Sequence, residues 1–191
     1  MARRLAAEIW KAHMRTYRLA ASLAASLLLS ACFVSKTPLF GPGEAEYPVA
    51  DGARFAIHKL GSDGKRLNEA PRHLTVTRKG TDYLYIIDGE EPVAGLMDDI
   101  GGGDYIALVR DAGKPGEAMY GLLRKKGDGW LRFSPECSDF IRAVEKHGED
   151  RTTFNIAPSG NDCAFSSYDD LRKAMAALVR YAAPDMEYVS E

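Results

Sequence analysis

The stretch Tyr83-Leu84-Tyr85-Ile86-Ile87 is apolar or aromatic at every position and is bounded by turn-forming residues on both sides. Lys79-Gly80-Thr81 lies before it and Asp88-Gly89 follows it, which is the pattern of a short β-strand between two turns. Successive side chains of a strand point to opposite faces of the sheet, so the tyrosines and Ile87 share one face and the other two residues share the opposite face. A sheet with one face in water would alternate apolar and polar residues. The stretch therefore predicts a sheet that is covered on both faces.

Strand-like runs of the same kind lie on both sides of this stretch and are separated by turn residues. Tyr105–Val109 and Met119–Leu123 are likewise apolar on both faces. The connections are tight, and tight connections join neighbouring antiparallel strands. We therefore predict an α+β fold with an antiparallel β-meander, curved or partly closed, and two helices packed on it. The runs that make up the meander are 54–60, 73–78, 82–87, 93–97, 104–110, 117–124 and 130–133.

The first predicted helix follows the last of these runs. Ser134 is a favourable N-cap, Pro135 suits the first helical position and Gly148 suits the C-terminal stop. The apolar residues recur every three or four positions, which is typical of a helix with one buried side. They are Cys137, Phe140, Ile141 and Val144.

The second predicted helix runs from about Tyr168 to Ala182. Ser167 with Asp170 three residues later resembles a capping box with Asp in place of Glu. Pro184 ends the helix, and we expect the residues after it to form a frayed tail. Two short strands are predicted between the helices, at 153–157 and 163–165.

A membrane-targeting leader is predicted from the sequence before Cys32. An apolar run begins after Arg15 and Arg18 and ends in Leu29-Ser30-Ala31-Cys32. This quartet resembles the lipobox of bacterial lipoproteins, in which a Leu and two small residues precede the lipidated Cys. The resemblance implies cleavage before Cys32 by signal peptidase II, a diacylglyceryl thioether on its sulfur, and an N-acyl chain. Residues 1–31 are then a lipoprotein signal peptide.

Two other interpretations of the leader stay open. The uninterrupted apolar and small-residue stretch from Leu19 to Val34 is a candidate transmembrane anchor, but it is shorter than the ~20 residues that cross a bilayer. A signal peptide cut elsewhere would leave Cys32 as an ordinary thiol. The start of translation is also open, because the region before the apolar run is long and contains Glu8 when read from Met1 but short and basic when read from Met14.

Removing the leader leaves a length that fits one domain, which we predict over residues 51–191. The leader holds five of the 25 Lys and Arg residues and one of the 27 Asp and Glu residues, so the remaining chain has a net charge of −6. Nucleic-acid binding depends on clustered Lys and Arg that neutralise phosphates. The acidic charge therefore argues against nucleic acid as a partner and against a polybasic attachment to anionic lipid.

Residues 32–50 are predicted to be a lipid-anchored spacer, because they hold three prolines and two glycines and show little periodicity. The apolar side chains near its root leave a second interpretation open, in which this part contacts lipid or the domain. They are Phe33, Val34, Leu39 and Phe40. Phe33 also occupies the position at which enteric bacteria use Asp to retain a lipoprotein at the inner membrane, so it favours the outer membrane.

Cys137 and Cys163 are predicted to form a disulfide, because export places both in a compartment where disulfides persist. Two buried free thiols are one alternative, and a nucleophile made of Cys137 with His147 is another, although no sharp local motif surrounds either Cys. The three histidines of the mature chain, His58, His73 and His147, have no metal-ligand spacing to one another. We therefore predict no metal, no cofactor and no catalytic residue.

Gly101-Gly102-Gly103 is flanked by Asp98, Asp99 and Asp104. A weak Ca²⁺ site is conceivable there, but a hairpin tip carrying carboxylates is the simpler interpretation. The glycines do not form a phosphate-binding loop, because the Gly-Lys-Ser/Thr ending is missing and no helix follows.

Five aromatic residues of the meander are predicted to share one face, namely Tyr83, Tyr85, Tyr105, Tyr120 and Trp130. Aromatic side chains on a curved sheet can line a ligand pocket, with a polar tip to orient the guest. The competing interpretation is an aromatic core layer beneath a helix.

These patterns together predict a membrane-anchored envelope lipoprotein that is not an enzyme and that binds a partner protein or an envelope component. Its lipid on Cys32 would attach it to the membrane, facing the periplasm. The alternative is a small-ligand carrier that resembles lipocalin-type barrels in general shape and holds an aromatic-lined cavity. A catalytic function would need converging titratable groups in a cleft, for which the sequence offers no sign.

Overall fold

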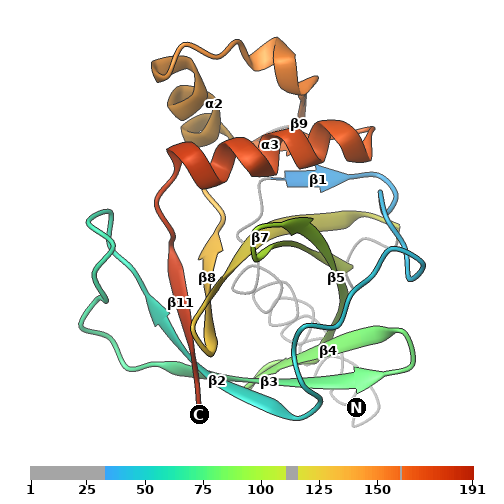
Figure 1. Ribbon diagram of the computed structural model, residues 1–191, viewed down its shortest axis with the longest axis vertical. Helices are drawn as coiled ribbons and strands as arrows, with labels where there is room; N and C mark the ends of the chain where they lie inside the picture. The colour runs from blue at the N-terminus through green and yellow to red at the C-terminus, as the bar shows by residue number, and fades with distance from the viewer. Residues whose placement is uncertain (1–32, 111–115, 160) are drawn as a thin grey trace, which may run out of the picture.

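The computed structural model describes residues 33–110, 116–159 and 161–191. The leader, the lipidation predicted at Cys32 and the alternative start at Met14 lie outside the described residues. Within them, an antiparallel meander closes into a barrel, and two helices pack against one side of it (Figure 1). The predicted α+β fold with a curved or partly closed meander is confirmed.

Eight strands form the barrel, and seven of them follow one another in the chain. The strands are β2 (Ala53–Lys59), β3 (Arg72–Lys79), β4 (Asp82–Ile87), β5 (Val93–Gly101), β6 (Asp104–Arg110), β7 (Ala118–Lys126), β8 (Gly129–Phe133) and β11 (Met186–Ser190). Every neighbouring pair in this ring is antiparallel. The ring closes because β11 pairs with β8 on one side and with β2 on the other. The predicted frayed tail after Pro184 is therefore wrong.

One of two hydrophobic cores fills the barrel lumen. Alternate side chains of the barrel strands point inward, as the two-residue period of a strand requires. Tyr83 and Tyr85 from the stretch Tyr83–Ile87 belong to this core, together with Trp130 of β8 and Tyr188 of β11. An interior of eight strands is just wide enough for side chains to fill or for one small ligand.

The second core lies between the barrel wall and the helices α2 (Cys137–Lys146) and α3 (Tyr168–Tyr181). β6 shows how one strand serves both cores. Ile106 and Leu108 point outward to the helices, whereas Ala107 and Val109 point into the lumen. The cover predicted for both sheet faces is thus confirmed at β6 but not at β4, where the outward side chains are only half-buried and belong to neither core.

The predicted spacer over residues 32–50 is wrong for the described residues from 33 onward. Strand β1 (Phe33–Ser35) pairs with β7 and, in parallel, with β10 (Asp162–Ala164). Phe33 is 0% exposed, and Phe40 and Val49 are buried as well. These apolar side chains enter the two cores because burial removes their surface from water. The packed domain therefore already includes residues before 51, from Phe33 onward in the described part of the chain.

The connection between the helices contains η1 (Arg151–Phe154), a 3-10 helix, and β9 (Ala157–Ser159), which pairs with β10. The first helix begins later than expected. Its N-cap is Glu136, and Ser134 is buried before the helix. Ser167 is the N-cap of α3 as predicted, since its side chain accepts a hydrogen bond from the Asp170 backbone N–H.

The entry into β11 is fixed by a buried arginine. Arg132 of β8 is 1% exposed and donates hydrogen bonds from Nε to the Asp185 carboxylate, at 3.1 Å to Oδ2. The backbone N–H of Asp185 also bonds the Arg132 carbonyl at 2.9 Å, and the Leu60 N–H bonds the Asp185 carbonyl at 2.9 Å. Asp185 thus joins β11 to both neighbouring strands. A buried charge of this kind is stable only when it is paired.

The closure of the barrel should be sensitive to Gly129. A Cβ atom built there would lie 2.1 Å from the backbone carbonyl oxygen of Tyr188 on β11. We expect Gly129→Ala to lower the free energy of unfolding by about 1–3 kcal/mol, as overpacking does elsewhere, measured by denaturant unfolding. Gly43→Ala is the matched control, because a Cβ there meets nothing within 4 Å. Equal stability of the two variants would contradict the close approach of β8 and β11.

Candidate functional site

The start of β1 is the place where the predicted lipid attachment meets the described fold. Phe33 lies opposite Tyr120 of β7 and Cys163 of β10, and all three are fully buried. Its ring packs edge-to-face on Phe140 of α2 at a centroid distance of 5.3 Å. The residue that directly follows Cys32 in the sequence is thus part of the helix-covered core.

Cys137 and Cys163 form a disulfide, as the sequence predicts. Their Cα atoms are 5.3 Å apart, and the bond links the first turn of α2 to β10. Because β10 is also the parallel partner of β1, the bond holds the helix layer against the strand that begins at Phe33. The alternatives of two free thiols and of a Cys137 nucleophile are thereby removed.

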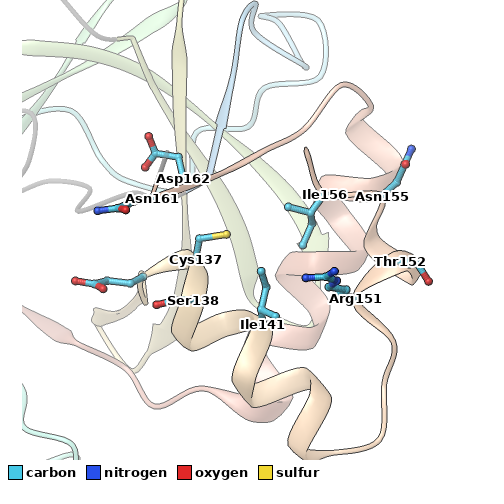
Figure 2. A pocket seen from close by; sticks show the side chains of 10 residues that line it. Cys137, Ser138, Ile141, Arg151, Thr152, Asn155, Ile156, Asn161 and Asp162 are labelled. Carbon is cyan, nitrogen blue, oxygen red and sulfur yellow. The ribbon is translucent and has the colours of Figure 1, made fainter. Parts of the chain in front are cut away.

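A pocket of about 550 Å³ lies beside this disulfide, between α2, η1 and β10 (Figure 2). Its lining is Glu136, Cys137, Ser138, Ile141, Arg151, Thr152, Asn155, Ile156, Asn161 and Asp162. None of these described residues is a histidine, and the Cys137 sulfur is already bonded. Nucleophilic catalysis needs a base within hydrogen-bond reach of the nucleophile, and among these described residues neither a free thiol nor a histidine is available for such a pair.

The structure does not bring the three histidines together. His58 on β2 lies opposite Glu187 of β11. The Nδ1 atom of His73 lies 2.8 Å from a carboxylate oxygen of Glu191. His147 stacks on Tyr181 with the ring centroids 4.5 Å apart. Among the described residues, no group of three or more His, Cys, Asp and Glu side chains is placed to hold a metal ion.

The acidic residues around Gly101–Gly103 are already paired with other groups. The Tyr168 hydroxyl donates to the Asp98 carboxylate, and burial, followed by this hydrogen bond, raises the pKa of Tyr168. Asp104 accepts two hydrogen bonds from Arg124, at 2.7 and 2.9 Å, and Asp99 accepts one from the Gly101 N–H. These contacts fit a hairpin tip better than a Ca²⁺ site, which needs six to eight oxygen ligands.

The five predicted aromatic residues do not share one face. Four of them, Tyr83, Tyr85, Tyr105 and Trp130, contribute to the lumen core, and the rings of the last two are 5.3 Å apart. Tyr120 points to the opposite side, into the helix-covered core. Its hydroxyl lies 2.7 Å from the Ser35 hydroxyl and accepts a hydrogen bond from the Leu39 N–H at 2.8 Å. Tyr120 therefore holds the N-terminal segment to the barrel and does not line the lumen.

A cavity of about 50 Å³ remains in the lumen between the inward side chains. Its lining is Val49, Phe55, Leu74, Val76, Tyr85, Met97, Ala107, Val109, Leu123, Trp130 and Tyr188. It is far smaller than the several hundred Å³ of a typical small-molecule pocket. The barrel is thus mostly filled by its own side chains.

The tyrosine hydroxyls in and around the lumen differ in their hydrogen bonding. The Tyr83 hydroxyl donates to the Val49 carbonyl at 2.8 Å and accepts from the Val49 N–H at 2.9 Å. The Tyr188 hydroxyl is hydrogen-bonded to Arg132. The Tyr85 hydroxyl is buried and has no hydrogen-bond partner among the described residues. Burial raises the pKa of Tyr85, so its hydroxyl keeps its proton.

Sequence reasoning missed Tyr188 and Val49 as neighbours of this cavity. Both lie in segments expected to be loose, namely the tail and the spacer. A weak signal for Tyr188 was present in the sequence. Met186, Glu187 and Tyr188 alternate apolar and polar residues, as a half-buried strand does. No comparable pattern marks Val49, whose place is set by its contact with Tyr83.

Comparisons with known proteins add no relative: no protein-family model, no curated protein and no solved structure matches this chain. The fold itself defines the class, an up-and-down eight-stranded barrel with two helices on its outer wall. A membrane-spanning helix, long and apolar enough to cross a bilayer, is not present among the described residues.

Tyr83→Phe and Tyr85→Phe should have different effects on stability, although the two residues lie on the same strand. Removing the Tyr83 hydroxyl leaves the N–H and carbonyl of Val49 without the partner that the structure gives them. We expect a loss of about 1–3 kcal/mol in the free energy of unfolding for Tyr83→Phe, and no loss or a gain of about 1 kcal/mol for Tyr85→Phe. Urea unfolding measures both. A loss for Tyr85→Phe comparable to that for Tyr83→Phe would show that its hydroxyl is satisfied.

The disulfide should carry a large share of the stability. The bonded cysteines are 26 residues apart. Closing such a loop lowers the conformational entropy of the unfolded chain, which stabilises the folded state by about 3.5 kcal/mol in the chain-entropy model. We expect the double variant Cys137→Ala/Cys163→Ala to lose about that much in denaturant unfolding. A reductant should lower the stability of the native chain and leave that of the double variant unchanged. If the reductant affects both alike, its effect does not come from this bond.

Proposed function

We propose that this protein is a lipid-anchored lipoprotein of the bacterial envelope that acts by binding and not by catalysis. The observation that carries the proposal is the position of the lipobox quartet directly before a buried strand. Cys32 is followed at once by Phe33, which is 0% exposed and pairs with strands on both sides. The described fold therefore already includes the residue that would come second in a mature lipoprotein.

This arrangement leaves no linker between the anchor and the domain. One residue spans at most about 3.6 Å of extended chain, so a lipid on Cys32 would keep β1 within one residue of the bilayer surface. The same end of β1 lies beside Cys163, in the helix-covered core. The domain would then act at the surface of the membrane that holds it and would not reach far across the periplasm.

The anchoring would come from acyl chains and not from charge. Residues 32–191 carry a net charge of −6, which gives no attraction to anionic lipid. A single acyl chain holds a protein only marginally, whereas two or more give stable attachment. The diacylglyceryl and N-acyl groups of a lipoprotein meet this requirement, so the proposal needs no basic patch.

The surface offers little for a large apolar partner site. Among the described residues, Leu67 is the one large hydrophobic side chain that is strongly exposed, at 44%. A partner protein would therefore bind a polar surface. The alternative, a small-ligand carrier, is favoured by a different observation, the small cavity with a mainly apolar lining in the barrel lumen.

Lipidation at Cys32 is tested on the full chain expressed in a bacterium and extracted from membranes. We expect intact-mass measurement to show a chain that starts at Cys32 and carries the mass of its acyl groups. Cys32→Ser should remove the acyl mass and prevent cleavage before position 32. The double variant Cys137→Ser/Cys163→Ser is the control, since it should lose the disulfide and keep the lipid.

A mature chain that starts elsewhere, or an unmodified Cys32 in the membrane-extracted protein, would refute the lipoprotein assignment. Equal acylation of the Cys32→Ser variant would place the lipid on another residue and would refute it as well.

Replacing Met14 with Leu separates the two possible starts of translation, because it should abolish export only when Met14 is the start.

A further inference from the structure

The pocket beside the disulfide has the size of a small-molecule site and fixed walls. Its volume of about 550 Å³ lies within the range of roughly 300–1,000 Å³ that ligand pockets have. The bond between Cys137 and Cys163 joins two of the walls, the start of α2 and β10. The third wall, η1, is capped by Asp150, whose carboxylate accepts a hydrogen bond from the Thr152 N–H at 2.9 Å. This carboxylate lies close enough to affect Arg151 by its charge, but it serves as the cap.

The lining contains one carboxylate and one guanidinium that are both available to a ligand. Glu136 at the N-cap of α2 and Arg151 at the start of η1 form no hydrogen bond or ion pair with any described residue. Asp162 brings a second carboxylate, but it already interacts with another group. Arg151 lies on the η1 side of the pocket, whereas Cys137, the neighbour of Glu136 in the chain, lies on the side of β10 (Figure 2). The two unpaired charges therefore come from different walls.

The rest of the lining combines apolar surface with hydrogen-bonding groups. Ile141 and Ile156 are half-buried residues packed on the helix-covered core, so part of their surface is left for an apolar group in the pocket. Ser138 and Thr152 add hydroxyls and Asn161 adds an amide, and these groups both donate and accept hydrogen bonds. A peptide chain matches this mixture, because each residue presents an N–H, a carbonyl and a side chain.

We propose that the pocket between α2, η1 and β10 binds a short peptide with two free ends, whose ammonium group pairs with Glu136 and whose carboxylate pairs with Arg151. The planar guanidinium fork of an arginine matches the two oxygens of a carboxylate. The inference rests on the binding function proposed above, since it names the chemical class of the bound component, and it does not depend on the lipid anchor.

A single amino acid is too short to reach both charges. Arg151 lies beyond Ile141 as seen from Cys137 (Figure 2). An α-helix rises by about 7.5 Å over the distance from Glu136 to Ile141, whereas an extended chain covers at most about 3.6 Å per residue. The ligand therefore needs at least about three residues.

The test uses the full chain in lipid nanodiscs and four forms of tetraalanine, which are free at both ends, acetylated at the N-terminus, amidated at the C-terminus, or blocked at both ends. Saturable shifts of the Ile141 and Ile156 methyl signals in NMR report binding in the pocket. We expect the free peptide to bind about 3- to 10-fold more tightly than either singly blocked form, which is the contribution of one partly exposed charge-assisted hydrogen bond.

Two variants assign these preferences to the two side chains. Arg151→Gln should remove the preference for the free carboxylate and keep the preference for the free amine, and Glu136→Gln should do the reverse. The matched controls are Arg142→Gln and Glu145→Gln, which change exposed charges of α2 outside the pocket lining. Both controls should keep both preferences. Denaturant unfolding checks that each variant is folded.

The inference is overturned if tetraalanine gives no saturable shifts, if the doubly blocked form binds as tightly as the free one, or if Arg151→Gln keeps the preference for the free carboxylate. Equal binding of free alanine would contradict the required length. Equal binding of the N-acetylated form would indicate the C-terminus of a longer chain as the ligand and would overturn the inference as well. A protein that carries lipid on Cys32 and binds no peptide would refute the peptide site and leave the lipoprotein assignment standing.

Discussion

The closure of the sheet by β11 is the constraint on which the rest of the structure depends. This five-residue strand makes backbone hydrogen bonds to β8 on one side and to β2 on the other. Without it, the meander would end in two open edges, which expose unpaired N–H and carbonyl groups. Closure also brings Met186 and Tyr188 into the lumen. The last residues of the chain thus decide whether the barrel has an interior at all.

The sequence predicts local features of this fold well. Glycine-containing turns marked the ends of the meander strands, and the tight connections implied antiparallel neighbours. The Ser167 cap predicted the start of α3 correctly. The closing strand β11 was missed because a short strand after Pro184 gains its stability from partners more than fifty residues away. The sequence pattern of five residues is only a weak indicator of pairing with strands so far away in the chain.

The candidate site shows the same limit. The aromatic residues of the lumen were identified, but Tyr120 was assigned to the wrong face. In the register of β6 with β7, Gly121 lies opposite Ala107, so residues 119, 121 and 123 face the lumen and Tyr120 faces the helices. A strand that is apolar on both sides gives no sign of which side is which. The hydrogen-bonding state of each tyrosine was equally hidden, because it depends on where Val49 and Arg132 lie.

The proposed anchor is connected to the disulfide through two neighbouring strands, β1 and β10. Phe33 begins β1, β1 pairs in parallel with β10, and Cys163 of β10 is bonded to Cys137 of α2. A lipid on Cys32 would pull on β1, whose pairing with β7 extends over only three residues. Three residues of β-pairing are weak by themselves, but the buried rings of Phe33 and Phe140 and the disulfide tie this short strand to the helix layer. The disulfide thus lies beside β1, the strand that follows the proposed anchor. A domain held by the bilayer at this strand would need resistance to fraying there.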